Sequence, residues 1–333
     1  MSLKQVVMAH RAMGTRFELV LYGEREAYLQ GVAEEVFAEI SRLDAQLSYY
    51  NDTSDINDIN SNAATQIVQV DPPLFHLLDS AKEWSEKTGG TFDITIAPLL
   101  HCWGFVGGMG RLPTGTEIEE ARKFVGMHHV CLHRNHYGVE FDSEGVRIDL
   151  GSIGKGYAID RAVELLRDYE ITSALLHGGT SSVYALGAPP DAEAWKVALQ
   201  QPFATTEGEH LAYLMLKDQS LSVSAPRNKG FEVDGRRYGH VIDARTGYPA
   251  PDNLLAAVVC NSAMEGDVCS TALLTRGAEW LQSFTAHLPE GEALFAYTNR
   301  DGQFCLQVSA PPDGKASVFE VVLEPNTPFE SSK

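Results

Sequence analysis

Residues 149–160 read DLGSIGKGYAID, in which three glycines surround Lys155 within six positions. The stretch follows a strand-like segment, VRIDL at 146–150, and precedes a helix-like run, so a strand-to-helix junction is predicted here. Glycines beside a lysine at such a junction allow the backbone to approach an anion closely, often a phosphate. The spacing G-x-x-G-K-G is neither the dinucleotide fingerprint nor the P-loop. A tight turn with close helix packing and a surface lysine would account for it equally well.

Hydrophobic periodicity predicts the elements on either side of this stretch. Apolar residues alternate at 17, 19 and 21, which predicts a strand, and they recur at helical spacing over about 27–47, which predicts an amphipathic helix. A second helix is predicted to begin at Pro72 and Pro73 and to end at Gly89 and Gly90. The remaining predictions are strands over 126–150, a helix over about 156–168, mostly strands over 172–260, a helix over about 263–276, and closing strands at 293–299, 304–310 and 318–324.

This mixture of helices and strands lacks a strict βαβ alternation, which indicates the α+β fold class. The sequence contains no evident linker, so a single domain is predicted over residues 1–325, either as one compact unit or as two intimately packed halves. A polar tail is predicted over 326–333.

Composition restricts the classes of partner. The 333 residues carry a formal net charge of −19, which would repel a nucleic-acid backbone and an anionic membrane, so neither is expected as a partner. An anionic substrate would need a local source of positive charge. No apolar run approaches the about 18 residues of a membrane span. As written, the chain predicts a cytoplasmic protein; removal of a leader before Met1 would instead indicate a periplasmic protein or a cell-envelope lipoprotein.

The cysteines are five in number and dispersed, without C-x-x-C spacing. This pattern predicts ordinary buried or half-buried thiols, and it argues against a disulfide framework and against a zinc site.

Residues 261–277, NSAMEGDVCSTALLTRG, combine helix signals with candidate ligands. Ser262 and Glu265 form a predicted capping box, and Gly277 ends the predicted helix. Asp267 and Thr271 lie at i and i+4 on one helical face, and their oxygen ligands would suit a hard cation such as Mg²⁺. The alternative is a solvated Asp267 and a Thr271 hydroxyl that bonds back to the helix.

Three further stretches carry polar residues that a loop or hairpin alone would not require. They are LSYYNDTSDINDIN at 47–60, otherwise a polar loop, GGTFDITIAPLLHCWGF at 89–105, otherwise a core edge, and a segment at 222–249 in which His240 precedes Asp243, Arg245, Thr246 and Gly247.

Together these stretches resemble the ApbE-type flavin transferases, enzymes that move FMN from FAD onto a protein threonine. The resemblance extends from about residue 12 to 275, with the motifs in the family's order. The motifs are AMGT at 12–15, the S-x-x-x-x-x-S-x-I-x-x-I-N pattern from Ser48 to Asn60, GGTFD with the following WGF, DLGSIGKGYAID, Gly178-Gly179, Y-x-H-V-I-D-x-x-TGYP, and D-x-x-x-T at Asp267 and Thr271.

The resemblance implies an ApbE-like α+β fold with two β-rich halves and packed helices around a central flavin cleft. It implies Mg²⁺ held by Asp267, Thr271 and the backbone carbonyl of Ser152, and it makes His240 the candidate catalytic residue. It also implies FAD, as substrate, in contact with Met13, Tyr50, Thr91, Phe92, Asp93, Asp149, Lys155 and Ser270.

The implied reaction transfers FMN to a threonine or serine of an acceptor flavoprotein with a D-G-[ST]-G-A-T-like motif and releases AMP. Two alternatives remain open: an FAD pyrophosphatase that gives FMN and AMP, and a flavin-binding protein without turnover. The sequence also departs from the family pattern at Ser152, Thr180 and Val223-Ser224-Ala225, where the family often has Gly, an acidic residue and T-S-G. Ala225 is expected to crowd a site built for glycine.

Overall fold

The computed structural model describes residues 3–203, 208–226, 230–250, 253–299, 301–311 and 316–322. The chain forms two compact units. The first unit comprises residues 1–43, 155–225 and 252–333, and the second comprises 44–154 and 226–251. The second unit is therefore made from two insertions into the chain of the first. The predicted tail over 326–333 lies outside the described residues.

The first unit is built on an eight-stranded sheet in the order β1-β2-β6-β7-β10-β15-β16-β17. Every neighbouring pair in it is antiparallel. A second, three-stranded sheet has the order β18-β9-β8. The strands of this unit are β1 (Lys4–Ala12), β2 (Thr15–Gly23), β6 (Ala174–Gly178), β7 (Ser182–Leu186), β8 (Trp195–Gln200), β9 (His210–Leu216), β10 (Gln219–Ser224), β15 (Asn253–Cys260), β16 (Glu292–Thr298), β17 (Phe304–Val308) and β18 (Phe319–Val321).

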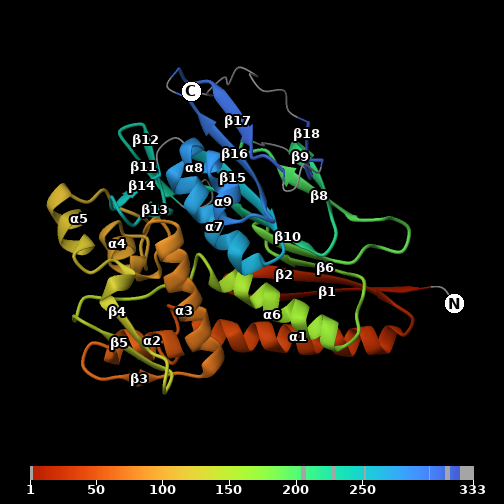
Figure 1. Cartoon of the computed structure of the whole chain (residues 1–333), viewed down its shortest axis with the longest axis horizontal. Coiled ribbons are helices and arrows are strands. Elements are labelled where there is room, and N and C mark those ends of the chain that lie inside the picture. The colour runs from red at the N-terminus through yellow and green to blue at the C-terminus, as the bar shows by residue number, and fades with distance from the viewer. Residues whose placement is uncertain are drawn as a thin grey trace. The chain divides into compact units, whose positions relative to one another are not determined.

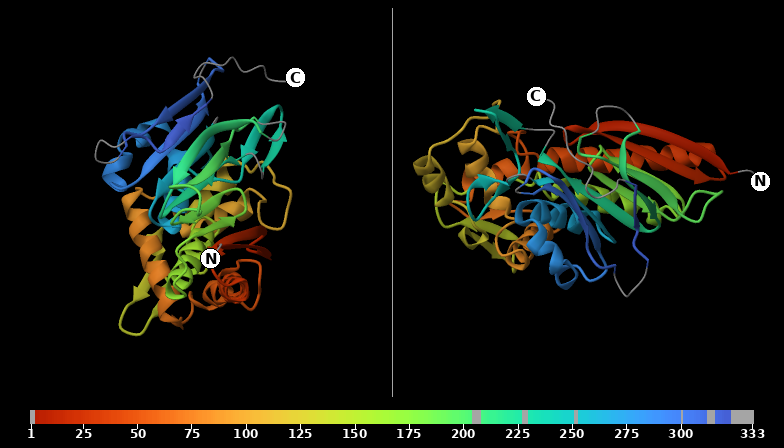
Figure 2. Two further views of the ribbon diagram at one scale, coloured as in Figure 1. Left: turned by 90° about the vertical axis from the view of Figure 1, so that its right-hand side faces the viewer. Right: turned by 90° about the horizontal axis from the view of Figure 1, so that it is seen from above.

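Helices cover one face of the large sheet, as Figures 1 and 2 show for the long α1 beneath β1 and β2. Val32, Val36 and Ile40 of α1 are buried with Ile159 and Leu166 of α6 in one hydrophobic cluster, which also contains residues of β1, β2, β6 and β7. The helical spacing of these apolar residues thus produces the packed face that the sequence predicts. The helices are α1 (Glu26–Leu47), α6 (Gly154–Asp168), α7 (Ala263–Arg276), α8 (Ala278–Gln282) and α9 (Phe284–His287).

The three-stranded sheet contributes to a second hydrophobic cluster of the first unit. Trp195, Val197 and Leu214 of β8 and β9 pack with Val183 of β7 and Leu221 of β10. Alternate residues of β8 are buried and exposed, as a strand with one face on a core requires. The mixed helix and strand content confirms the predicted α+β class.

The second unit consists mainly of short helices with small antiparallel sheets. Its core contains Leu99, Trp103, Ile118 and Ile242. Its elements are α2 (Asp55–Asn62), β3 (Val68–Gln69), α3 (Pro72–Lys87), the 3₁₀ helix η1 (Ile94–Ile96), α4 (Ala97–Cys102), α5 (Gly115–Arg122), the 3₁₀ helix η2 (Met127–His129), β4 (Val130–His133), β5 (Gly138–Phe141), β11 (Gly230–Val233), β12 (Arg236–Gly239), β13 (Ile242–Asp243) and β14 (Tyr248–Pro249).

One sequence prediction for this unit needs correction. Residues 146–150, VRIDL, form no strand, although β4 and β5 confirm the strands predicted earlier in 126–150. The polar stretch 47–60 is partly helical, because Ser54 accepts a hydrogen bond from the N–H of Asn57 and caps α2. The helices α4 and α5 are also absent from the sequence predictions.

The cysteines are all free. Cys102, Cys260 and Cys269 are buried, as predicted, and Cys305 is half-buried, whereas Cys131 is exposed. Among the described residues, no helix has both the length and the apolar character that crossing a membrane requires.

Candidate active site

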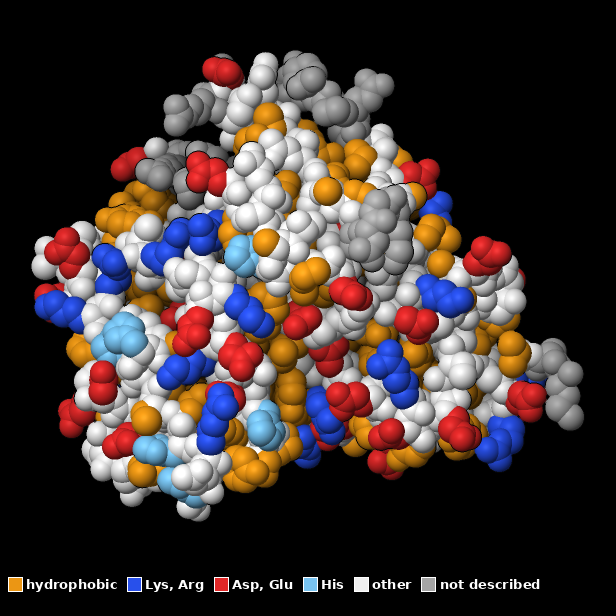
Figure 3. All heavy atoms as spheres, in the orientation of Figure 1, with side chains coloured by type: hydrophobic (Ala, Val, Ile, Leu, Met, Phe, Trp, Pro, Cys, Tyr) orange, Lys and Arg blue, Asp and Glu red, His pale blue; other side chains and the backbone are white. Residues whose placement is uncertain are grey.

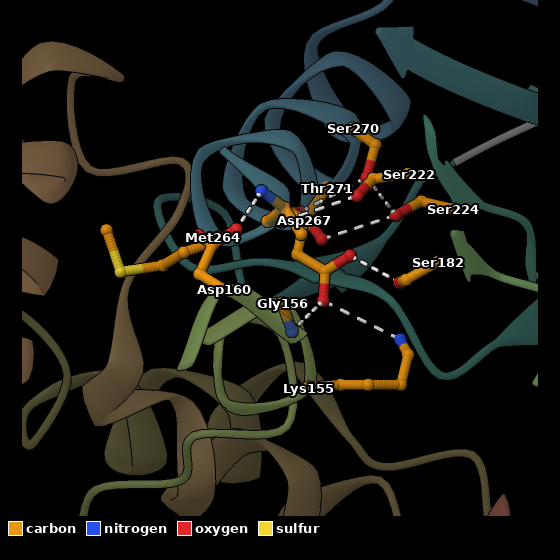
Figure 4. Close-up of polar contacts among 11 residues, drawn as sticks. Lys155, Gly156, Asp160, Ser182, Ser222, Ser224, Met264, Asp267, Ser270 and Thr271 are labelled. Carbon is orange, nitrogen blue, oxygen red and sulfur yellow. Dashed lines mark hydrogen bonds and ion pairs between the residues drawn. The ribbon is translucent and has the colours of Figure 1, made fainter. Parts of the chain in front are cut away.

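The carboxylate of Asp267 lies at the centre of a polar cluster in the first unit (Figure 4). Asp267 is only 6% exposed. Its Oδ2 accepts a hydrogen bond from the N–H of Gly156 at 2.8 Å, and its Oδ1 accepts one from Ser182 Oγ at 2.7 Å. Lys155 Nζ lies 3.6 Å from Oδ2, which is too long for a direct hydrogen bond but gives a close ion pair. The lysine of the glycine-rich stretch and the aspartate of the α7 pattern therefore lie together.

Hydroxyl groups surround the next turn of α7. Ser224 Oγ, at the end of β10, lies 2.9 Å from Ser270 Oγ and 3.3 Å from Thr271 Oγ1. Ser270 Oγ also donates to the backbone carbonyl of Asp267 at 3.1 Å. Thus Lys155, Asp267, Ser270 and Thr271, which the resemblance assigns to the metal and to FAD, lie close together in the structure. These donors are all oxygen apart from the lysine, which fits a hard cation or the neutralisation of a phosphate.

The position of Asp267 depends on a close contact between the beginnings of α6 and α7. An ideal Cβ on Gly156 would lie 2.2 Å from the carbonyl oxygen of Ala263, so only glycine fits at this point. Asp160 of α6 accepts hydrogen bonds from Ser262 Oγ at 2.6 Å and from the N–H groups of Ala263 and Met264 at 2.7 and 3.0 Å. This carboxylate caps the N-terminus of α7 together with Ser262, whose Oγ accepts from the N–H of Glu265.

Burial raises the pKa of Asp160, although its three hydrogen bonds oppose the shift. The negative charge of Asp267 raises the pKa further. The two carboxylates are therefore held close enough to interact, and each is surrounded by backbone N–H and hydroxyl donors that stabilise its charge.

The AMGT and Gly178-Gly179 motifs shape the edge of the same unit. Met13 and Gly14 have φ angles of 50° and 69°, which make the two-residue turn between β1 and β2. Met13 packs against the cluster of α1 and α6. An ideal Cβ on Gly178 would lie 3.4 Å from Lys155 Cδ, so the stem of the lysine passes over the end of β6. Gly179 has a φ of 69°, and a Cβ there would lie 2.3 Å from Thr15 Oγ1.

In the second unit, the GGTFD motif ends in a saturated carboxylate. Asp93 Oδ2 accepts hydrogen bonds from Ser85 Oγ and the N–H of Met127, both at 3.0 Å. Its Oδ1 accepts from the N–H and the hydroxyl of Thr95 at 2.8 and 2.5 Å. Asp93 therefore organises the backbone around the motif, and this role accounts for its presence without a ligand.

Thr91 of the same motif differs from Asp93, because its polar group is unsatisfied within the described part of the chain. It is 2% exposed, and among the described residues its Oγ1 has no hydrogen-bond partner. Buried hydroxyls are normally satisfied, so an unsatisfied one requires an explanation, and a bound ligand is one of the recognised explanations. Phe92 beside it is buried in the core.

Asp149 places the end of 146–150 against the GGTFD segment. The N–H of Asp149 donates to the carbonyl of Ile94 at 2.7 Å, and its Oδ1 accepts from the N–H of Gly151 at 2.6 Å. Ser152 follows in the turn before α6. The ring of Tyr50 is exposed, and partial desolvation of its phenol, followed by the negative charge of Asp149, raises the pKa of Tyr50. The structure thus brings Asp149 to the predicted flavin-contact segments of this unit.

His240 lies half-buried in the bend that follows β12. Three residues later, Asp243 holds Arg245 in a two-pronged ion pair, with Oδ1 to Nε at 3.0 Å and Oδ2 to Nη2 at 2.7 Å. An ideal Cβ on Gly90 would lie 3.8 Å from Arg245 Cγ, so the segment after His240 contacts the GGTFD motif. Trp103 Nε1 donates to the carbonyl of Gly247 at 2.8 Å and joins the WGF and TGYP motifs.

Several residues of the first-unit cluster were missed by sequence reasoning. Ser182, Ser222 and Ser224 come from β7 and β10, and they approach α7 only through the tertiary fold. Ser224 belongs to Val223-Ser224-Ala225, where the family often has T-S-G. This departure was the only sequence feature that drew attention to Ser224.

Comparison with known proteins gives a consistent result. The model of the ApbE family matches residues 13–295. A relative from Klebsiella pneumoniae, named FAD:protein FMN transferase, is 31% identical over 292 residues, which cover 87% of this chain and 88% of the relative. A second relative with that name, from Salmonella typhimurium, is 28% identical and covers 87% and 83%.

Solved structures agree with these matches. The ApbE protein of Thermotoga maritima has a TM-score of 0.82 and 27% identity, with coverage of 92% of this chain and 97% of its own. The flavinyl transferase ApbE of Pseudomonas stutzeri, in its apo form, has a TM-score of 0.81 and 26% identity, with coverage of 95% and 98%. The family model, the curated relatives and the solved structures together show that this chain belongs to the ApbE family.

Proposed function

We propose that this chain is an FAD:protein FMN transferase that uses Mg²⁺, attaches FMN to a threonine or serine of an acceptor flavoprotein, and releases AMP. The observation that carries the proposal is the buried Asp267 carboxylate beside Lys155, in a chain of the ApbE family. A carboxylate and a lysine in contact provide both a metal ligand and a cation for a phosphate in a protein of net charge −19.

Asp267 and Thr271 are the proposed metal ligands of the first unit, and the Ser152 carbonyl keeps the assignment that the resemblance gives it. Oxygen donors from one carboxylate and nearby hydroxyls fit Mg²⁺. When bound, the ion would neutralise the pyrophosphate and polarise the bond that breaks. Lys155 binds phosphate oxygens of FAD. The backbone at the start of α6 orients the pyrophosphate, because helix N-termini attract anions.

The proposed flavin contacts include, besides Lys155, Met13 and Ser270 in the first unit and Tyr50, Thr91, Phe92, Asp93 and Asp149 in the second. Of these, Thr91 has the best support for a direct contact, because its buried hydroxyl lacks a partner within the described part of the chain. Asp93 has the least support for a direct contact, because its four hydrogen bonds already hold the motif backbone.

The reaction is an in-line displacement. The acceptor hydroxyl oxygen forms a bond to the FMN-side phosphorus, the bridging P–O bond breaks, and AMP leaves with the bonding pair. The hydroxyl proton passes to His240, which is proposed as the general base. Replacing it by Asn is expected to slow turnover about 100- to 10,000-fold.

Metal dependence is tested with two variants of α7. Asp267→Ala should abolish Mg²⁺-dependent turnover, because it removes the only charged ligand assigned. Thr271→Val should have a milder effect, since it removes one neutral oxygen and preserves the side-chain shape. Turnover is measured as AMP release across a Mg²⁺ titration. If Asp267→Ala responded to Mg²⁺ as the unmodified chain does, the metal assignment would be wrong.

Transfer is distinguished from hydrolysis by the dependence on an acceptor. A peptide with a D-G-[ST]-G-A-T-like motif should accelerate AMP release from FAD and gain the mass of one phosphoester-linked FMN. In an FAD pyrophosphatase, free FMN and AMP would form at equal rates without the peptide. The hydrolase would be the correct assignment if FAD were cleaved rapidly without acceptor and none of several acceptor peptides were labelled.

A further inference from the structure

The β4–β5 hairpin of the second unit carries a group of metal-binding side chains apart from the ApbE motifs. Its first strand lies in a histidine-rich segment, HHVCLHRNH at 128–136. Cys131, His133 and Glu140 each offer a ligand atom, and these atoms all lie within 4.8 Å of one another. Within the described parts of the chain, this is the one group of at least three Cys, His, Asp or Glu side chains that meets this distance.

The register of the hairpin explains why the three side chains meet. Cys131 pairs directly with Glu140 across the two strands, and His133 follows Cys131 by two residues. Residues i and i+2 share one face of a strand, and directly paired residues share the same face of a sheet. The opposite face carries Val130, Val139 and Phe141, which are buried. The three ligands therefore project from the outer face, where Cys131 is exposed.

Neighbouring side chains keep this face polar and ordered. His133 Nε2 lies 3.0 Å from Glu140 Oε2, and the His136 ring stacks on the His133 ring with centroids 5.3 Å apart. Just beyond the paired strands, His129 Nδ1 lies 2.8 and 2.9 Å from the carboxylate oxygens of Asp142. In Figure 3, histidine side chains gather at the surface over the region where Figure 1 places β4 and β5.

We propose that Cys131, His133 and Glu140 bind one divalent transition-metal ion of the zinc type, with the fourth position open to water. A tetrahedral zinc site has bonds of about 2.0–2.3 Å, which puts its ligand atoms roughly 3–4 Å apart. The three ligand atoms lie within 4.8 Å of one another, so they would have to approach slightly to hold one ion. The paired strands place the three residues on one face before any metal binds.

The ligand chemistry separates this site from the proposed Mg²⁺ site. A thiolate and an imidazole suit zinc, cobalt or nickel, whereas Mg²⁺ takes oxygen ligands. Asp267 and Thr271 lie in the first unit, and the hairpin lies in the second. Dispersed cysteines argued against zinc at the level of sequence, but the partners of Cys131 come from the strand register and not from C-x-x-C spacing. The inference does not depend on the proposed flavin chemistry.

The test is a titration of the metal-free full chain with Co²⁺, a spectroscopic probe for zinc sites. We expect one equivalent to give a near-ultraviolet sulfur-to-cobalt charge-transfer band together with the visible bands of tetrahedral cobalt, and added Zn²⁺ to displace both. Cys131→Ser should abolish the charge-transfer band. His133→Gln should weaken Co²⁺ binding by about tenfold or more.

Two controls make the assignment specific. Cys305→Ser alters the other thiol that is not fully buried and should leave the spectrum unchanged, and Asp267→Ala should do so as well. Circular dichroism of each variant checks that the fold is intact. A charge-transfer band that survives Cys131→Ser, a band lost in Cys305→Ser, or no band in the unmodified chain would overturn the proposal.

Discussion

At the scale of single residues, the two threonines near Asp93 differ in the hydrogen bonds that their hydroxyls make. Thr95 Oγ1 donates to Asp93 at 2.5 Å and accepts from the N–H of Gly126 at 2.6 Å. Thr91 Oγ1 is as deeply buried but has no hydrogen-bond partner within the described residues. A buried hydroxyl without a partner costs stability, and the proposed hydrogen bond to bound FAD would remove that cost.

We therefore expect Thr91→Val to weaken FAD binding without destabilising the fold. Valine has nearly the same shape and removes the unsatisfied hydroxyl, so the free energy of unfolding should stay the same or rise by up to about 1 kcal/mol. Loss of one hydrogen bond to FAD should raise the Kd by up to about tenfold. Chemical denaturation and a flavin fluorescence titration measure the two quantities.

Thr95→Val is the matched control, because it removes a hydroxyl of the same type that is fully used. It should lower the free energy of unfolding by about 1–3 kcal/mol, since it leaves the N–H of Gly126 without its acceptor. If Thr91→Val destabilised the chain as much as Thr95→Val while FAD bound normally, the Thr91 hydroxyl would be structural.

The sequence could predict which site residues lie together only where they are close in the chain. Asp267 and Thr271 share a helix face by spacing alone, whereas the ion pair of Asp267 with Lys155 is set by the fold. Ser182 and Ser224 could not be predicted, because they reach α7 from strands far away in the chain. The Cys131 group was missed for the same reason, since its partner Glu140 is set by hairpin register.

At the scale of elements, α7 formed as predicted because its signals are local. Ser262 caps it, Gly277 ends it with a φ of 74°, and most of the apolar residues between them are buried. The 146–150 segment shows where such reasoning fails. Its alternating residues resemble a strand, but the buried Asn60 amide takes the place of a strand partner: its Oδ1 accepts from the N–H of Ile148 at 2.7 Å and its Nδ2 donates to the Ile148 carbonyl at 2.9 Å. Local pattern cannot reveal that a distant side chain will satisfy these backbone groups.

The contact between α6 and α7 gives a prediction at this scale. Gly156→Ala places a Cβ 2.2 Å from the backbone oxygen of Ala263, so the two helix N-termini must separate. We expect a loss of about 1–3 kcal/mol in the free energy of unfolding, typical of overpacking. The N–H of Gly156 also donates to Asp267, so turnover should fall as well. Chemical denaturation and AMP release report the two effects.

Gly31→Ala in α1 provides the contrast. Nothing lies within 4 Å of an ideal Cβ at Gly31, which is an exposed helix position. Alanine there should raise the free energy of unfolding by about 0.5–1 kcal/mol, because glycine is a poor helix former. Equal effects of the two substitutions would show that the α6–α7 contact does not constrain position 156.

At the scale of the whole molecule, the charge balance sets a condition on any anionic substrate. The chain has 45 acidic and 26 Lys and Arg residues. On the face drawn in Figure 3, the acidic side chains are spread widely and do not form a single patch. The long-range field therefore opposes the approach of the two FAD phosphates, whereas Lys155 acts only at short range. Long-range fields govern association rates, and short-range contacts govern dissociation.

The final prediction follows from this division and rests on the proposed function. Without Mg²⁺, the association rate constant for FAD should rise a few-fold as ionic strength increases from about 0.01 M to about 0.15 M, since the Debye length shortens from about 30 Å to about 8 Å and screens the net repulsion. Stopped-flow flavin fluorescence measures the rate. Riboflavin, which lacks the phosphates, is the control and should associate at a rate independent of salt. An FAD association rate that falls with salt would mean that positive charge near Lys155 outweighs the net charge of −19 even at a distance.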